Sequence, residues 1–162
     1  MSKIRPVSSD DAEAICAIYN YYVQNSTISF EEEGVSPTEM SRRIVDVTES
    51  LPWLVIENEG VVDGYAYATK WRARSAYRFS VEISVYLSPN AIGKGYGANL
   101  YANLMEQLAI LGVHAVIAGI ALPNEKSIKL HEKIGLKKIA HFEQVGFKNQ
   151  QWVDVGYWQK ML

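Results

Sequence analysis

Glycine residues between an expected strand and an expected helix are the first candidate for ligand binding. The run Gly93-Lys94-Gly95-Tyr96-Gly97 follows the alternating apolar residues 79–87 and leads into apolar residues at helical spacing. Glycines let backbone N–H groups gather around an anion, and a helix start adds the positive end of its dipole. The spacing matches neither the P-loop nor the pattern G-x-G-x-x-G. We therefore expect either a phosphate-bearing ligand or a tight turn without a ligand.

Glu82 is the candidate general base. It lies on the polar side of the alternating segment, two residues from both Ser80 and Ser84. Partial burial there would raise the pKa of its carboxyl group toward the range that suits proton removal. A solvated glutamate on an exposed sheet face is the alternative. The glycine turn that follows favours the functional interpretation.

A turn rich in arginine precedes the same strand. Arg72, Arg74 and Arg78 lie close together, next to Trp71 and Tyr77. Guanidinium groups bind carboxylates through paired hydrogen bonds, so the cluster suits a small anionic or zwitterionic substrate. A solvated charged turn would explain the same spacing.

Three polar residues share one face of an expected helix near the C-terminal end. Asn124, Ser127 and His131 are spaced three and four residues apart, so a ligand beside this helix would meet all three. Alternatively, Asn124 only caps the helix and His131 is a partly exposed helix residue. His114 and His141 show no metal-ligand spacing with His131, so we expect no metal site.

Composition excludes several classes of protein. The 162 residues are 48% hydrophobic and 21% charged, with a net charge of −2 and no long basic run, so nucleic acid is not an expected partner. Cys16 is the one cysteine, which excludes an internal disulfide, and its apolar neighbours indicate a buried, inert thiol. No signal peptide or membrane-spanning apolar run is found, so we expect no membrane partner. These features predict a single cytoplasmic domain over residues 1–162.

Hydrophobic periodicity and capping residues predict the elements that position these candidates. Strands are expected over residues 3–6, 53–57, 61–70, 79–87, 113–121, 136–145 and 151–160. Helices are expected from Ser9 or Asp10 to about 24, from Ser36 through 47, from the glycine turn through 111, and over 125–134. Ser36 should cap its helix, with Glu39 completing a capping box. Residues 26–31 are too irregular for an element, and residues 146–149 should connect the last two strands. This order predicts a single mixed α/β sheet.

Taken together, these residues resemble the GNAT superfamily of N-acetyltransferases over essentially the whole chain. The residues that carry the resemblance lie in segments 28–31, 72–78, 80–87 and 124–135. The glycine turn alone is a superfamily feature. The run Tyr-Arg-x-Ser-Val-Glu-x-Ser-Val-Tyr over 77–86 more specifically resembles the phosphinothricin and methionine sulfoximine/sulfone acetyltransferases. The resemblance implies an α/β (α+β) GNAT-like fold, with a mixed sheet of about seven strands and about four helices.

The same resemblance implies acetyl-CoA as donor and a primary amine with a carboxylate as acceptor. It assigns the donor to Val85, Tyr86, Leu87, Gly93, Lys94, Gly95, Tyr96, Gly97, Ala98, Asn124, Ser127 and Lys133. It assigns the acceptor pocket to Phe30, Glu31, Arg72, Arg74 and Tyr77. Glu82 would remove the amine proton through a water molecule, and the amine would attack directly. Many members have tyrosine where His131 stands, so either His131 or water would protonate the leaving thiolate. Ile92 departs from the Gln or Arg with which the superfamily's turn often begins.

The resemblance leaves the acceptor open. An amino-acid analogue such as phosphinothricin, methionine sulfoximine or methionine sulfone is expected first, because the arginines suit a small carboxylate. A protein N-terminus or another metabolite amine is the alternative within the fold, and a catalytically silent acyl-CoA-binding module is the alternative outside catalysis. The family also implies a homodimer. Apolar surface for it could come from Phe142, Phe147, Trp152, Tyr157 and Trp158, although an ordinary core explains these aromatic residues equally well.

Overall fold

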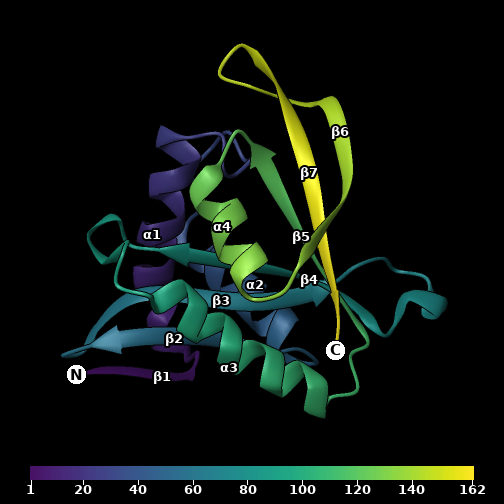
Figure 1. Cartoon of the computed structure of the whole chain (residues 1–162). Coiled ribbons are helices and arrows are strands. Elements are labelled where there is room, and N and C mark those ends of the chain that lie inside the picture. The colour runs from purple at the N-terminus through teal and green to yellow at the C-terminus, as the bar shows by residue number, and fades with distance from the viewer.

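Seven strands form one mixed sheet, in the order β1-β2-β3-β4-β5-β7-β6, in the computed structural model, which describes all residues Met1–Leu162 (Figure 1). The strands are β1 Ser2–Pro6, β2 Trp53–Asn58, β3 Val61–Lys70, β4 Ser80–Leu87, β5 Ala115–Leu122, β6 Lys137–Lys148 and β7 Gln151–Met161. The helices are α1 Ala12–Asn25, α2 Pro37–Thr48, α3 Tyr96–Ile110 and α4 Glu125–Lys133. The expected α/β fold with a mixed sheet is confirmed.

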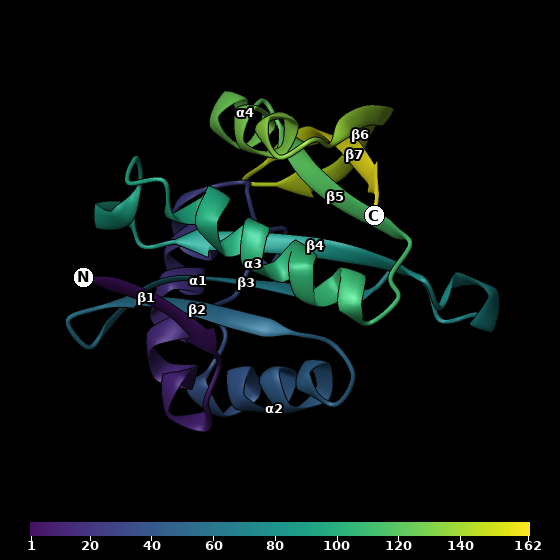
Figure 2. The ribbon, with the colours of Figure 1, turned by 60° about the horizontal axis from the view of Figure 1, so that its bottom comes forward.

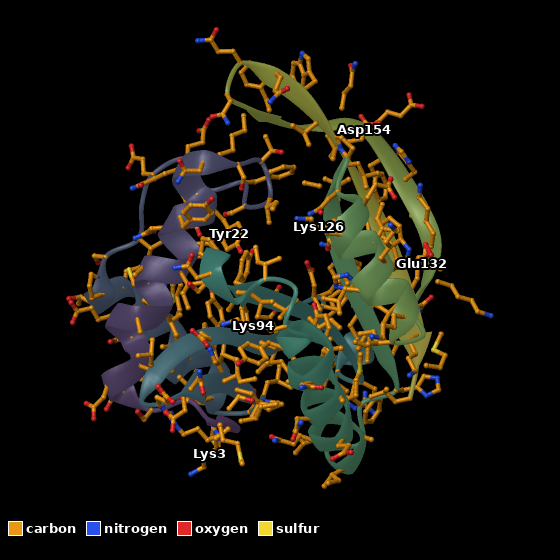
Figure 3. The ribbon with its side chains drawn as sticks, turned by 60° about the vertical axis from the view of Figure 1, so that its left-hand side comes forward. Lys3, Tyr22, Lys94, Lys126, Glu132 and Asp154 are labelled. Atoms are coloured by element: carbon orange, nitrogen blue, oxygen red, sulfur yellow. The ribbon has the colours of Figure 1, made fainter.

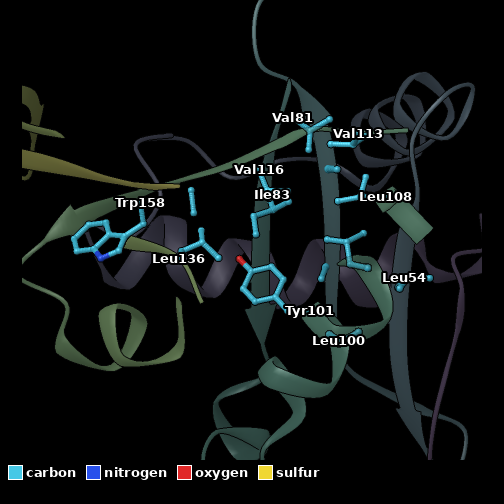
Figure 4. Close-up of a cluster of buried hydrophobic side chains, with 14 of the residues drawn as sticks. Leu54, Val81, Ile83, Leu100, Tyr101, Leu108, Val113, Val116, Leu136 and Trp158 are labelled. Carbon is cyan, nitrogen blue, oxygen red and sulfur yellow. The ribbon is translucent and has the colours of Figure 1, made fainter. Parts of the chain in front are cut away.

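Helices cover both faces of the sheet (Figure 2). α1 and α2 pack on one face, where Ile15, Met40, Ile44 and Tyr65 belong to one buried cluster. α3 packs on the other face through a second cluster of buried side chains from several elements (Figure 4): Leu54, Val81, Ile83, Leu100, Tyr101, Leu108, Val113, Val116, Leu136 and Trp158. Because β4 contributes to the second cluster with alternate residues, its intervening residues face α1. None of the helices has the length and apolar character needed to cross a membrane.

β4 and β5 run parallel and then separate (Figure 1). They pair only over Ser80–Ala115, Val81–Val116 and Glu82–Ile117. Beyond this point β4 continues alongside β3, and β5 continues alongside β7. One edge of β4 therefore has no neighbouring strand from residue 83 onward.

Most expected elements are confirmed within a few residues, but the last connection is placed wrongly. β6 continues through Lys148, and the turn consists of Asn149 and Gln150, which have φ values of 53° and 60°. Two consecutive positive φ angles are typical of a tight hairpin turn, and neither residue is the glycine that normally marks one. Gly146 suggested the turn, but it lies inside the strand, where a Cβ would be 2.5 Å from the Phe30 ring.

The expected capping box at the start of α2 is correct in one half only. The Ser36 hydroxyl accepts a hydrogen bond from the Glu39 N–H at 3.1 Å, as expected of a cap. The Glu39 carboxylate instead binds Arg42 and Arg43. Charge-assisted hydrogen bonds to nearby guanidinium groups thus replace the hydrogen bond to the cap residue's backbone.

Candidate functional site

Glu82 lies at the point where β4 and β5 separate. It belongs to the last backbone pair of the two strands, and its half-buried side chain lines a cavity of about 460 Å³. We call this the larger cavity; its wall includes Tyr19, Phe30, Glu31, Glu82, Val155 and Tyr157. Burial raises the pKa of the Glu82 carboxyl group, and the positive charge of Arg72 partly opposes this rise. The carboxylate therefore has the burial expected of a proton acceptor.

The arginine-rich turn acts on Glu82 through the positive charge of Arg72. The Arg72 guanidinium lies over the Trp71 ring, 4.6 Å from its centroid. The Trp71 ring in turn meets Tyr157 edge-on at 5.7 Å. Arg72, Arg74 and Tyr77 are all exposed, and none of them lines this cavity or the smaller one described below. The structure thus brings Arg72, rather than Arg74, close to Glu82.

The irregular segment 26–31 forms one wall of the larger cavity. Phe30 and Glu31 both line it, as the sequence predicts for residues of one pocket. The Glu31 carboxylate accepts two hydrogen bonds from Arg43, at 2.6 and 2.9 Å, and one from the Tyr19 hydroxyl. Arg43 holds the pKa of the Glu31 carboxyl group below its usual value. Sequence analysis did not identify Tyr19 and Arg43, because no local pattern connects them with Glu31.

A smaller cavity of about 60 Å³ adjoins the larger one. Asn124, Ser127 and His131 line it from α4, so the structure brings these three candidates together. The two cavities share wall residues that include Ser84 and Gly119. A Cβ added at Gly119 would be 3.0 Å from the Tyr157 ring and 3.6 Å from the Glu82 Oε1 atom. The absence of a side chain at Gly119 keeps this junction open.

Hydrogen bonds at its ends show how the backbone of β4 is oriented. The Ser80 carbonyl accepts from the Trp71 N–H at 3.3 Å, and the Ser88 N–H donates to the Asp63 carbonyl at 2.8 Å. The register with β3 is regular between these points. Alternation along an antiparallel strand then directs the backbone groups of even-numbered residues to β3 and those of odd-numbered residues to the open edge.

This orientation distinguishes the three candidates at the end of β4. Val85 presents its backbone N–H and C=O to the open edge, whereas the backbone of Tyr86 pairs with β3. Tyr86 reaches both cavities with its side chain. The Leu87 carbonyl accepts a hydrogen bond from the Tyr22 hydroxyl of α1. Val85 therefore offers the freest backbone groups of the three.

The glycine turn leaves backbone donors free at the start of α3. Gly93 and Gly95 have φ values of +87° and +80°, which side-chain-bearing residues rarely adopt, and a Cβ at either would meet nothing within 4 Å. No side chain caps α3, so the N–H groups of its first turn, Tyr96 to Ala98, remain available to an anion. Lys94 lies in this turn and is labelled in Figure 3. Gly97 packs against Leu130, so α3 and α4 approach closely here.

His131 is buried and both of its ring nitrogens are paired. Nδ1 lies 2.7 Å from the Ser127 carbonyl, which can only accept, so Nδ1 carries the proton. Nε2 then accepts from the buried Tyr101 hydroxyl at 2.9 Å. Burial lowers the pKa of His131, which favours this neutral form. The arrangement ties α4 to α3 and leaves His131 no free proton to donate.

The remaining candidates on α4 differ in their surroundings. The Asn124 Oδ1 atom accepts from the Ser127 N–H at 3.2 Å, so Asn124 caps the helix while lining the smaller cavity. Lys133 is exposed in the last turn and lines neither cavity. No cluster of three His, Cys, Asp or Glu side chains is arranged to hold a metal ion. Cys16 is buried, with its thiol donating to the Val35 carbonyl.

Known proteins are similar to this chain in sequence and in architecture. A family model described as an acetyltransferase (GNAT) domain matches residues 4–156. The phosphinothricin N-acetyltransferase of Streptomyces viridochromogenes is 40% identical over 158 residues, covering 98% of this chain and 86% of that protein. The L-methionine sulfoximine/L-methionine sulfone acetyltransferase of Salmonella typhimurium is 34% identical over 170 residues, covering 98% and 94%. A crystal structure of a GNAT superfamily phosphinothricin acetyltransferase from Sinorhizobium meliloti, in complex with AcCoA, matches with a TM-score of 0.96 and 37% identity, covering 99% and 88%.

Proposed function

Because the chain belongs to the GNAT family of acetyltransferases, we propose that it acetylates the primary amine of a small amino-acid-like acceptor that carries a carboxylate. Phosphinothricin, methionine sulfoximine and methionine sulfone are the acceptors of this type that its named relatives support. The observation that carries the proposal is the position of Glu82, a half-buried carboxylate at the point where β4 and β5 separate and at the wall of the larger cavity. Acetyl-CoA, as the second substrate, supplies the acetyl thioester.

The residues around the smaller cavity suit acetyl-CoA. The open edge of β4 at Val85 offers one N–H and one C=O to the amide groups of the pantetheine arm. The uncapped start of α3 and Lys94 offer donors and positive charge to the pyrophosphate. Asn124 and Ser127 line the opposite wall, and the exposed Lys133 remains a proposed contact for the nucleotide end.

The larger cavity suits the acceptor. Its volume of about 460 Å³ is ample for an amino acid. Phe30 supplies an apolar wall. Arg72 is outside the cavity lining, but its charge acts on Glu82, and it would supply the cation that binds the acceptor carboxylate. Arg74 and Tyr77 are retained as outer contacts, because both lie in the turn that follows Arg72. Glu31 acts through its hydrogen bonds to Arg43 and Tyr19, which leave its carboxylate occupied.

Proton removal is the chemical contribution of this chain. Glu82, with its pKa raised by burial, accepts a proton from the acceptor's ammonium group through a water molecule. The neutral amine nitrogen then forms the amide bond to the acetyl carbon as the bond to sulfur breaks, and the nitrogen loses its remaining extra proton to water. The leaving thiolate takes a proton from water. His131 orients Ser127 and the start of α4 in this scheme, since its proton is committed to the Ser127 carbonyl.

A thiol-release assay tests this proposal. Free CoA is measured with each of the three acceptors above, with their decarboxylated amines, and with a peptide bearing a free N-terminus. We expect release with a carboxylate-bearing acceptor and at least about tenfold lower kcat/KM without the carboxylate. If acetyl-CoA raises the Tm but no amine releases CoA, the chain is a binding module. Preference for the peptide would instead assign it to protein N-termini.

We also propose a homodimer that uses the β6–β7 hairpin. Phe142, Phe147 and Trp152 are at least half exposed there, and a surface of this kind suits a protein partner. Trp158 is buried in the core and does not contribute, so for this residue the alternative of an ordinary core applies. Light scattering tests the proposal: Phe147→Lys should convert a dimer of the wild type into a monomer, and a monomeric wild type would overturn it.

A further inference from the structure

The cavity wall formed by residues 26–31 has no helix or strand of its own. Ser29 lies at its centre and is only 4% exposed. The Ser29 hydroxyl pairs with the Tyr19 hydroxyl at 2.7 Å and accepts from the Glu31 N–H at 3.2 Å. These bonds shape the segment locally, but they come from α1 and from the segment itself. Arg43 of α2 holds Glu31 at the end of the segment, and the β6–β7 hairpin contacts the rest of it.

Lys148 of β6 provides these contacts. Its side chain is only 2% exposed, although it lies in the last residue pair before the hairpin turn. Its Nζ atom donates to the Val23 carbonyl at 2.8 Å and to the Ser29 carbonyl at 2.6 Å. One ammonium group thus joins the end of α1, the wall segment and the β6–β7 hairpin.

Gly146 adds a second contact from the same strand. It lies two residues before Lys148, so both residues face the same side of β6, and both are buried. The Phe30 ring packs directly on Gly146, because a Cβ there would be 2.5 Å from two ring atoms. The two residues therefore hold the backbone and the apolar side chain of the wall segment.

Stability alone does not explain a lysine at this position. Burying an ammonium group is costly unless its donors are paired, and no carboxylate forms a salt bridge with Lys148. Burial also lowers the pKa of Lys148. An apolar side chain of similar length would fill the same space without this cost. Such a side chain could not form the hydrogen bonds to the Val23 and Ser29 carbonyl groups.

We propose that Lys148 is a positioning residue for the acceptor, because its hydrogen bonds to the Val23 and Ser29 carbonyls fix Phe30 and Glu31 at the wall of the larger cavity. This proposal rests on the proposed function for its kinetic consequence. It assigns control of acceptor binding to the tip of a hairpin that lies more than a hundred residues from the wall segment in sequence.

Steady-state kinetics with Lys148→Met test the kinetic consequence. We expect the KM for the acceptor to rise roughly tenfold or more, while kcat and the KM for acetyl-CoA stay within about twofold. Lys137→Met, which removes an exposed lysine from the same strand, is the matched control and should change nothing. Lys148→Arg should recover part of the acceptor affinity. An unchanged acceptor KM, or an equal rise in both KM values, would overturn the proposal.

Hydrogen exchange separates this proposal from the proposed function. In Lys148→Met the amides of residues 24–31 should exchange faster than in wild type and in Lys137→Met, whatever acceptor the enzyme takes. Gly146→Ala should loosen the same residues by displacing Phe30. If wild type releases no CoA but this exchange pattern is observed, the proposed function fails and the role of Lys148 in positioning the segment stands. Unchanged exchange at residues 24–31 would refute the role of Lys148.

Discussion

Glu82 and Ile117 form the last backbone pair between β4 and β5. From this pair onward the two strands separate, and the Glu82 side chain lies at the wall of the cavity between their diverging ends. Gly119, two residues after Ile117, leaves the space beside the Glu82 carboxylate free. The point in the sheet at which β4 and β5 stop pairing therefore determines both where the Glu82 carboxylate lies and where the cavity beside it opens.

Replacement of Glu82 should stabilise the fold at neutral pH. The carboxyl pKa is raised in the folded state, so ionisation of Glu82 disfavours folding once the pH exceeds its unfolded pKa of about 4.5. Glu82→Gln should therefore have a higher Tm than wild type at pH 7, and the difference should vanish below about pH 4. Calorimetry at both pH values checks this. A lower Tm for Glu82→Gln at pH 7 would show that the carboxylate is favourably paired.

Arg72 should matter more to the acceptor than Arg74. Neither arginine lines a cavity, but of the two only Arg72 has a charge that acts on the Glu82 carboxylate. Arg72→Met should raise the acceptor KM by roughly tenfold to a hundredfold, and Arg74→Met by less than about threefold. Arg72→Met should also move the rising limb of the pH–rate profile to higher pH, because the cation that opposes the raised pKa is gone. A larger effect of Arg74→Met on the acceptor KM would reverse the assignment.

Gly119→Ala should obstruct the junction of the two cavities. Its Cβ would lie 3.0 Å from the Tyr157 ring and 3.6 Å from the Glu82 Oε1 atom, so the ring at the cavity wall must shift. We expect kcat/KM to fall by roughly threefold to thirtyfold with little change in Tm. Gly34→Ala is the matched control, because its Cβ would make only ordinary contacts at 3.5 Å. Equal activity of the two variants would show that the junction has room to spare.

The neutral state of His131 predicts the shape of the pH–rate profile. With the proton held on Nδ1 and the pKa lowered, His131 is uncharged at neutral pH. The kcat should therefore rise through the pKa of Glu82 and then remain level up to about pH 8.5. A fall in kcat with rising pH near or below His131's normal pKa of about 6.5, absent in His131→Gln, would instead identify the imidazolium as the acid.

Loss of the Tyr101 hydroxyl should affect stability more than chemistry. Tyr101 is fully buried and donates to His131, so Tyr101→Phe leaves Nε2 without a partner. We expect a loss of about 1 kcal/mol in the free energy of unfolding, measured by urea titration, and a kcat within about threefold of wild type. A loss of kcat above a hundredfold would place Tyr101 in the proton path.

Local pattern predicted most of the fold and the half-buried position of Glu82. Alternation predicted β4 and the half-buried position of Glu82, and the glycine turn followed by apolar helical spacing predicted the start of α3. These features depend only on residues close together in sequence, so hydrophobic periodicity can predict them. The pairing of β5 with β7, which places Tyr157 beside Gly119, depends on the whole chain and left no local signal.

The tertiary contacts of Arg72 and Lys148 could not be predicted from sequence patterns. Arg72 and Arg74 have the same chemistry, and only the fold distinguishes the one near Glu82. Lys148 was assigned to a turn, because Gly146 is a stronger turn signal than Asn149 and Gln150. Its partners Val23 and Ser29 lie more than a hundred residues away in sequence, and such hydrogen bonds arise only from tertiary packing.

The pH dependence of kcat/KM for wild type and Glu82→Gln, measured by CoA release, tests the central claim most directly. Acetyl-CoA binding to both proteins is measured by calorimetry as the control. We expect equal acetyl-CoA affinity, a wild-type profile that rises above pH 4.5 through the raised pKa of Glu82, and a loss of about 10² to 10⁴ in kcat/KM for Glu82→Gln without that limb. Full activity of Glu82→Gln across the same pH range, with acetyl-CoA still bound, would contradict the assignment of Glu82 as the base.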